Sequence, residues 1–180
     1  MPTPVLLTLS GSLRRDATNR KLLLESVRLF GDASHVQGNL DLPLYDGDVE
    51  ARDGIPAAVQ LLADQITAAD AVVISTPEYN TAPSGVLKNA LDWVSRTEGR
   101  PFADKPVAVM SAAAGPTGGE TAQEILRGFL LSFRPRVLAE PKLHLGGSSD
   151  QFDENGHLTS DAHLTTLAAL MQNLRAEIEI

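Results

Sequence analysis

Short, uninterrupted apolar runs alternate with helical patterns along this chain. The clearest run, Ala71–Ser75, contains no charged residue. A strand that is apolar on both sides has to be buried on both faces, which is typical of a parallel sheet covered by helices. The predicted strands are Val5–Leu9, Val36–Leu42, Ala71–Ser75, Pro106–Ala112 and Val137–Leu145, the last of them broken by Pro141. The predicted helices are Asn19–Phe30, Ile55–Ala68, Leu87–Ser95, Glu120–Ser132 and Ala162–Glu177.

The order of these elements predicts a single α/β domain over residues 1–180. We expect a flavodoxin-like, doubly wound, five-stranded parallel sheet with strand order 2-1-3-4-5 and helices on both faces. A chain of 180 residues is long enough to bury one such core. Ligands of open α/β sheets bind at the carboxyl ends of the strands, where the strand order reverses. The loops after the first, third and fourth strands are therefore the places to look for a functional site.

Composition argues against several functional classes. The net charge of −8 disfavours a nucleic acid or an anionic membrane surface as partner. No apolar run approaches the roughly 20 residues that span a bilayer. The chain has no cysteine, which excludes disulfides and thiolate chemistry and fits a cytoplasmic location. We expect no metal site, because the four histidines are scattered and the acidic turn Gln151–Gly156 lacks the ligand pattern of a calcium loop.

The loop after the first strand combines hydroxyl groups, cations and a helix start. Four of the fifteen Lys and Arg residues lie within the eight positions 14–21. Free backbone N–H groups and a helix N-terminus suit a phosphate group. The alternative is a capping turn with solvated arginines. The loop matches neither a Walker A nor a GxGxxG pattern, which argues against ATP and against a Rossmann-bound dinucleotide.

The loop after the third strand reads Pro77-Glu78-Tyr79-Asn80 and offers polar and aromatic groups. Because the first and third strands are neighbours in the predicted order, their two loops flank one crevice. A phosphate loop opposite such a loop suits a ligand with a phosphate tail and a planar, hydrogen-bonding head, such as FMN. The loop after the fourth strand, Ser111–Gly119, would form a third wall through its glycines, unless it is a simple strand-to-helix turn.

These loops resemble those of the NAD(P)H-dependent FMN reductase family, which includes small quinone, azo-dye, chromate and ferric reductases. The family pattern of the first loop is close to G-S-L-R-x-x-S-x-N. Ala17 stands where that pattern has serine, and Thr18 offers a hydroxyl beside it. The residues that match are Gly11, Ser12, Leu13, Arg14 and Asn19 in the first loop, Pro77–Asn80 in the second, Gly85, Leu87, Lys88, Asn89, Asp92 and Trp93 in the following helix, and, more loosely, Gly118, Gly119, Gln123, Leu126 and Arg127.

The resemblance implies an FMN-dependent NAD(P)H:acceptor oxidoreductase. NAD(P)H would give a hydride to FMN, and electrons would pass on to quinones, chromate, azo compounds or ferric complexes. No side chain is expected to act as a catalytic acid or base. The alternatives are an FMN reductase that releases reduced flavin to a partner and a flavodoxin-type electron carrier. The implied cofactor-binding residues are Ser12, Arg14, Thr18, Asn19, Pro77, Glu78, Tyr79, Asn80, Ser111 and Gly115.

The helix after the third strand also suggests an oligomer. Its apolar residues exceed what one narrow buried stripe needs, so part of this surface is predicted to contact another subunit in a homodimer or homotetramer. Arg96 at the end of this helix is implied to contact substrate or a partner subunit, and the alternative is that it complements the helix dipole. The apolar residues concerned are Leu87, Leu91, Trp93 and Val94.

Overall fold

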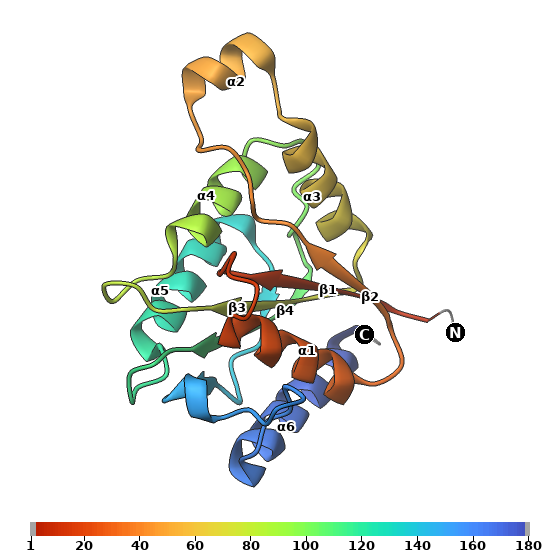
Figure 1. Ribbon diagram of the computed structural model, residues 1–180. Helices are drawn as coiled ribbons and strands as arrows, with labels where there is room; N and C mark the ends of the chain where they lie inside the picture. The colour runs from red at the N-terminus through yellow and green to blue at the C-terminus, as the bar shows by residue number, and fades with distance from the viewer. Residues whose placement is uncertain (1–2, 179–180) are drawn as a thin grey trace.

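A parallel sheet with the order β2-β1-β3-β4-β5 lies at the centre of the computed structural model, which describes residues 3–178 (Figure 1). Every strand pairing in it is parallel. These observations confirm the predicted fold class and strand order. The strands are β1 (Val5–Ser10), β2 (Ser34–Gly38), β3 (Ala71–Thr76), β4 (Pro106–Ala112), β5 (Arg136–Val137) and β6 (Leu143–Leu145), which pairs with the carboxyl half of β4.

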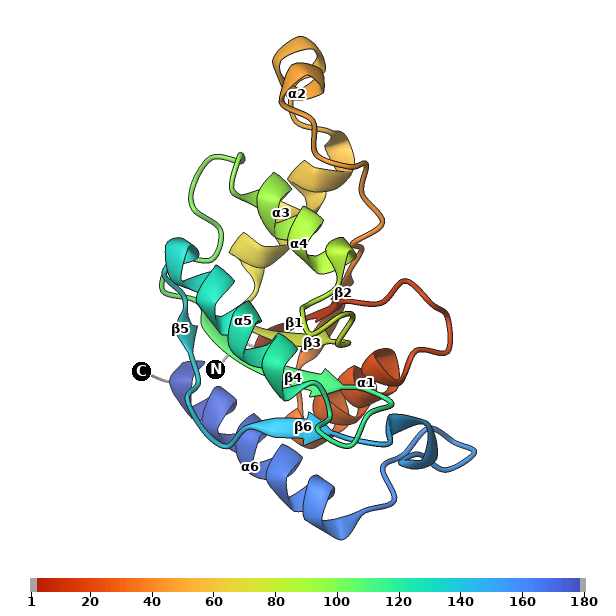
Figure 2. The ribbon, with the colours of Figure 1, turned by 90° about the vertical axis from the view of Figure 1, so that its left-hand side faces the viewer.

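Helices cover both faces of the sheet, as Figure 2 shows. Successive side chains of a strand therefore enter different cores. In β3, Val72 and Ile74 belong to one core, whereas Ala71 and Val73 belong to the other. This two-sided burial is the physical reason for the uninterrupted apolar runs. Helices α3 (Ala57–Ala68), α4 (Gly85–Val94) and α5 (Glu120–Leu130) cover one face, and α1 (Thr18–Phe30) and α6 (Asp161–Ile178) cover the other.

The second strand occupies Ser34–Gly38 and not the predicted Val36–Leu42. Leu40 is buried and Leu42 packs against the same core, although both follow the end of the ladder. The apolar pattern continued past the strand because these two side chains are buried without strand pairing.

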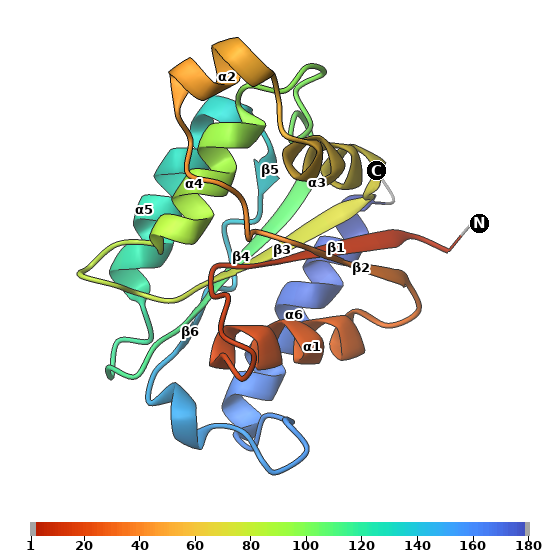
Figure 3. The ribbon, with the colours of Figure 1, turned by 45° about the horizontal axis from the view of Figure 1, so that its top comes forward.

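A short helix, α2 (Gly47–Asp53), was missed by the sequence analysis. The Asp46 side chain caps it by accepting a hydrogen bond from the Asp48 N–H at 2.9 Å. None of its residues, all of which the structure describes, is buried. A helix that buries no face has no periodic apolar pattern to find. Figures 1 and 3 show α2 projecting from the body of the protein.

Two other elements differ in detail from the predictions. The predicted fifth strand consists of β5 and β6, and Pro141 lies in the interruption between them, as expected. Helix α5 ends at Leu130, and a short 3₁₀ helix, Leu131–Phe133, continues where an α-helix was predicted.

The apolar side chains of α4 pack against other parts of the same chain. The four residues predicted to include a subunit contact are buried, and Trp93 has no exposed surface. The Trp93 Nε1–H donates to the Pro43 carbonyl at 2.7 Å, and the Tyr45 ring meets the indole edge to face with centroids 5.0 Å apart. The prediction of a subunit contact through surplus apolar residues of α4 was therefore wrong, because Pro43 and Tyr45 of the same chain cover Trp93.

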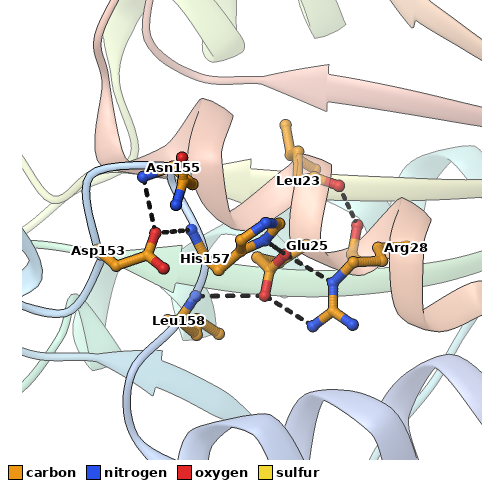
Figure 4. A network of polar contacts seen from close by, with 8 residues as sticks. Leu23, Glu25, Arg28, Asp153, Asn155, His157 and Leu158 are labelled. Carbon is orange, nitrogen blue, oxygen red and sulfur yellow. Dashed lines mark hydrogen bonds and ion pairs between the residues drawn. The ribbon is translucent and has the colours of Figure 1, made fainter.

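A buried carboxylate joins α1 to the turn that precedes α6 (Figure 4). Glu25 accepts two hydrogen bonds from the Arg28 guanidinium, both at 2.9 Å, and lies 2.9 Å from the His157 Nδ1 atom. The Leu158 N–H also donates to it at 3.2 Å. The contact between Glu25 and His157 was not predicted, because the two residues are 132 positions apart in the chain.

This cluster makes a prediction about acid stability. Burial opposes ionisation of Glu25, but the hydrogen bonds from Arg28, His157 and the Leu158 N–H outweigh it and lower its pKa from 4.5 to about 2. A depressed pKa stabilises the fold fully above pH 4.5, and this stabilisation is lost as the pH falls toward 2. Glu25→Gln should lower the free energy of unfolding at pH 7 by about 3 kcal/mol.

Urea unfolding of both proteins at pH 7 and pH 3 measures this effect. The difference between wild type and variant should shrink to less than half at pH 3. Glu124→Gln is the control, because Glu124 forms a half-exposed pair with Lys142 and should cost less than about 1 kcal/mol. A difference that is the same at both pH values would contradict the assignment.

Candidate functional site

Three loops meet at the carboxyl end of the sheet, the edge that Figure 2 turns toward the viewer. The loops after β1 and β3 are in direct contact. The Gly11 N–H donates to the Ser75 carbonyl at 2.8 Å, and the Ser84 hydroxyl donates to the Gly11 carbonyl at 2.5 Å. A Cβ atom on Gly11 would lie 2.9 Å from the Pro77 ring, so glycine permits this close approach. The loops after β1 and β3 therefore lie side by side, as the order of their strands implies.

The start of α1 is left without a side-chain cap. The cap residue is Ala17, which has no side-chain oxygen to accept a first-turn N–H. Ser12 is buried above this turn, and Arg14 and Arg15 are exposed beside it. Arg20 instead folds back, and its Nε–H donates to the Ser12 carbonyl at 3.3 Å. Of the four predicted cations, Arg14 and Arg15 are exposed, Arg20 braces the loop, and the Lys21 ammonium lies 5.7 Å from the centroid of the Phe152 ring.

The Thr18 hydroxyl, expected to replace the missing serine, lies 3.0 Å from the Ser148 hydroxyl. Ser148 is buried, and its N–H donates to the Ala113 carbonyl at 3.1 Å. The segment after β6 therefore contacts both the start of α1 and the loop after β4. This segment was not predicted to lie near the site, because Thr18 and Ser148 are 130 positions apart in the chain.

The loop after β3 is held by Glu78 and by a tight turn. The Glu78 carboxylate accepts the Ala122 N–H at 2.9 Å, in the first turn of α5. Tyr79 and Ala82 exchange backbone hydrogen bonds of 2.9 and 3.1 Å. The two residues between them, Asn80 and Thr81, have φ angles of 50° and 62°. This is a two-residue turn of the I′ kind, and Tyr79 beside it is 53% exposed.

The loop after β4 is held by contacts with the segment 144–147. The Gly115 carbonyl accepts the N–H groups of Gly118 and Gly147, both at 3.3 Å. A Cβ atom on Gly118 would lie 2.4 Å from the backbone of His144. Ser111 is fully buried, and its hydroxyl accepts the Gln123 amide at 3.2 Å. Ser111 is therefore a support under the loop, whereas Gly115 is exposed on it.

Arg96 lies at the end of α4, away from these loops. Its Nε–H is 3.0 Å from both carboxylate oxygens of Glu50, on α2. This hydrogen bond raises the pKa of the Arg96 guanidinium. Glu50 also accepts the Tyr45 hydroxyl at 2.9 Å. Within one chain, Arg96 thus fastens α2 to α4, and the three loops and Arg96 are not brought together.

The amino-acid sequence matches a known family over most of its length. The family model described as NADPH-dependent FMN reductase covers residues 4–150. The chain is 38% identical to an NAD(P)H-dependent FMN reductase of Pseudomonas aeruginosa over 94% of this chain and 92% of that protein. It is 41% identical to a quinone reductase of Escherichia coli K12 over 78% of this chain and 76% of the relative.

This chain belongs to the NADPH-dependent FMN reductase family. The family expectation from the sequence is confirmed. A similar solved structure is FerB, a flavoenzyme NAD(P)H:(acceptor) oxidoreductase from Paracoccus denitrificans, with a TM-score of 0.87, 30% identity and coverage of 98% of both chains. Within residues 3–178 no helix is long and apolar enough to cross a bilayer, and no group of three or more acidic or histidine side chains is arranged to hold a metal ion.

The turn after β3 makes a stability prediction. Thr81 is a β-branched residue at positive φ, a conformation that is strained for such side chains. Thr81→Gly creates the Asn-Gly pair that I′ turns prefer and should raise the free energy of unfolding by about 0.5–1 kcal/mol.

Urea unfolding measures this change. Thr81→Val keeps the branched side chain and loses only its hydroxyl, so this control should show no gain. Destabilisation by the glycine would show that the turn is not strained.

Proposed function

We propose that this protein is an FMN-dependent NAD(P)H:acceptor oxidoreductase. The observation that carries the proposal is the uncapped start of α1 beside Ser12 and Arg14, at the point where the order of β1 and β3 reverses. First-turn N–H groups without a side-chain acceptor form an anion site, and this switch point is where doubly wound sheets bind their ligands. Family membership supports the same ligand.

The residues of these three loops have the chemistry that FMN binding would require. The phosphate would lie on the α1 start, with Ser12, Arg14 and Thr18 around it. The loop Pro77–Asn80 would position the ring, with the exposed Tyr79 beside it. The backbone near Gly115 would face the pyrimidine edge of the ring. Ser111 would support this wall from below, because its hydroxyl is bonded to Gln123.

When bound, FMN would supply the redox chemistry by accepting a hydride from NAD(P)H and passing electrons to an acceptor. The protein's part is to bind and orient. The Glu78 carboxylate is held by the Ala122 N–H, so its role is to fix the ring loop against α5. We propose no side-chain acid or base. Quinones are the first candidate acceptors, because the Escherichia coli relative is named a quinone reductase. Chromate, azo compounds and ferric complexes are the other candidates.

A second candidate function is release of reduced flavin to a partner, which the name of the Pseudomonas aeruginosa relative favours. Retention of flavin through gel filtration distinguishes a bound cofactor from a released product. A flavodoxin-type carrier would not oxidise NAD(P)H. A cytoplasmic location completes the proposal and is supported by the absence of cysteine.

The direct test is the colour of the purified protein and its response to NAD(P)H. Loaded protein should be yellow and should bleach when NADPH or NADH is added under argon. Flavin released by heat should be FMN, because the loop after β1 offers a site for one phosphate. FAD as the main flavin, or no bleaching with either nucleotide, would contradict the proposal.

Arg14 makes a sharper prediction about the phosphate. A charge-assisted hydrogen bond contributes about 1.5–3 kcal/mol, so Arg14→Ala should weaken FMN binding by about tenfold or more. Riboflavin, which lacks the phosphate, should lose much less affinity. Arg15→Ala is the matched control, because it removes the same charge from the next exposed position. Equal losses of FMN and riboflavin in Arg14→Ala would exclude a phosphate contact.

We also propose that the working unit is a homodimer or homotetramer. The support from this structure is the segment around α2. Leu44 is 84% exposed beside the half-exposed Tyr45, and the neighbouring α2 buries none of its described residues. Apolar surface of this kind is typical of an interface. Arg96 and Glu50 lie at the same place, so a partner subunit would meet them.

Light scattering at micromolar concentration should give a mass of at least two chains. Leu44→Asp should shift the protein toward the monomer, whereas Leu131→Asp, at an exposed leucine after α5, should not.

Arg96→Ala should raise the KM for NAD(P)H or acceptor without releasing FMN. A wild-type monomer with full activity would refute a site shared between subunits.

A further inference from the structure

Asn19 was expected to contact the phosphate, but its side chain turns into the interior. It is only 3% exposed. Its Oδ1 atom accepts the Ser75 hydroxyl at 2.7 Å and the Ala112 N–H at 3.2 Å, and its Nδ2 group donates to the Ala112 carbonyl at 2.9 Å. Both lone pairs of the oxygen and one of the two amide hydrogens are therefore used by β3 and β4.

The partners of Asn19 stand at the strand ends from which the ring-facing loops begin. Ser75 is one residue before the end of β3, and Ala112 is the last residue of β4. The loops that follow start at Pro77 and Ala113. Asn19 itself lies in the first turn of α1, directly after the phosphate loop. One side chain thus connects all three walls of the crevice.

We propose that Asn19 is a positioning residue that fixes the spacing between the phosphate loop and the two ring-facing loops, and that it is not a phosphate ligand. The inference rests on the proposed function, because it concerns the flavin that this crevice would hold. Loss of the spacing acts on the ring contacts as well as on the phosphate. A direct phosphate ligand, by contrast, acts only on a flavin that carries a phosphate.

The chemistry of the contact explains why asparagine stands here. The site requires one group that accepts two hydrogen bonds and donates one. An aspartate would face the Ala112 carbonyl without a proton to donate. An apolar side chain of the same size would leave a hydroxyl, an N–H and a carbonyl buried without partners, each at a cost. The amide satisfies all three.

The test compares the affinities of FMN and riboflavin in a set of variants. Asn19→Ala should weaken both ligands by a similar factor, about tenfold, so that the ratio of their Kd values changes less than threefold. Arg14→Ala should change this ratio by tenfold or more. Ser75→Ala removes the hydroxyl at the other end of the contact and should reproduce the Asn19→Ala pattern at smaller size. The double variant should lose no more than Asn19→Ala alone.

Ser26→Ala is the matched control. It removes a buried hydroxyl from the same helix, where Ser26 bonds only the Leu23 carbonyl, and should change neither affinity. If Asn19→Ala does not fold, the milder variant Ser75→Ala tests the proposal, because it should still weaken FMN and riboflavin by a similar factor. A loss confined to FMN in Asn19→Ala, with Ser75→Ala unchanged, would make Asn19 a phosphate ligand. No loss of either ligand in either variant would also overturn the proposal.

An arm without flavin separates this inference from the proposed function. In the flavin-free protein, amide hydrogen exchange should accelerate in residues 11–16, 77–83 and 113–118 together, in both Asn19→Ala and Ser75→Ala but not in Ser26→Ala. If exchange accelerates and the wild type binds neither flavin, the proposed function fails and the coupling of the loops stands. If the wild type binds flavin and exchange stays unchanged, the coupling fails and the function stands.

Discussion

Polar side chains buried at the carboxyl end of the sheet need hydrogen-bond partners within the protein, and this requirement determines how the three loops are arranged. A sheet covered on both faces offers such groups no water, and an unpaired buried donor or acceptor is costly. Among residues 3–178, most of the buried hydroxyl and amide side chains lie at this end of the sheet: Ser10, Ser12, Asn19, Ser75, Thr76, Ser84, Ser111, Gln123 and Ser148. Some of their hydrogen bonds join different loops or elements, such as those between Ser75 and Asn19, Ser84 and Gly11, and Ser148 and Thr18. Satisfying these groups therefore also fixes where the loops lie.

The strands and most helices could be predicted because burial imposes a pattern on the sequence. Continuous apolar runs marked β1, β3 and β4, and the pairing order followed from the alternation with helices. The helix α2 escaped because it buries nothing, and β2 was displaced because Leu40 and Leu42 are buried outside the ladder. Elements whose apolar pattern matches their buried face were therefore predicted correctly. Elements were missed or displaced where no face is buried, as in α2, or where apolar residues are buried outside a strand, as after β2.

The three loops could be located from sequence, but the tasks of their side chains could not. The sequence alone does not distinguish a polar residue that faces a ligand from one that bonds a neighbouring loop. Asn19 and Ser111 were both expected to face the ligand, and both are buried and hydrogen-bonded to other protein groups. Ser148 and Gln123 support the loops from distant positions, and only the tertiary fold places them there. Long-range hydrogen bonds leave no periodic trace in a sequence.

This division of tasks is consistent with an alanine at the start of α1. Ala17 stands where a serine is usual in the family pattern. Buried side chains hold the backbone of the loops, and the N–H groups at the α1 start would then be the donors to the phosphate in the proposed function. An anion site made mainly of main-chain donors would depend less on any one hydroxyl. Substitutions in the supporting layer should therefore disturb binding more broadly than the loss of a hydroxyl at the surface of the crevice.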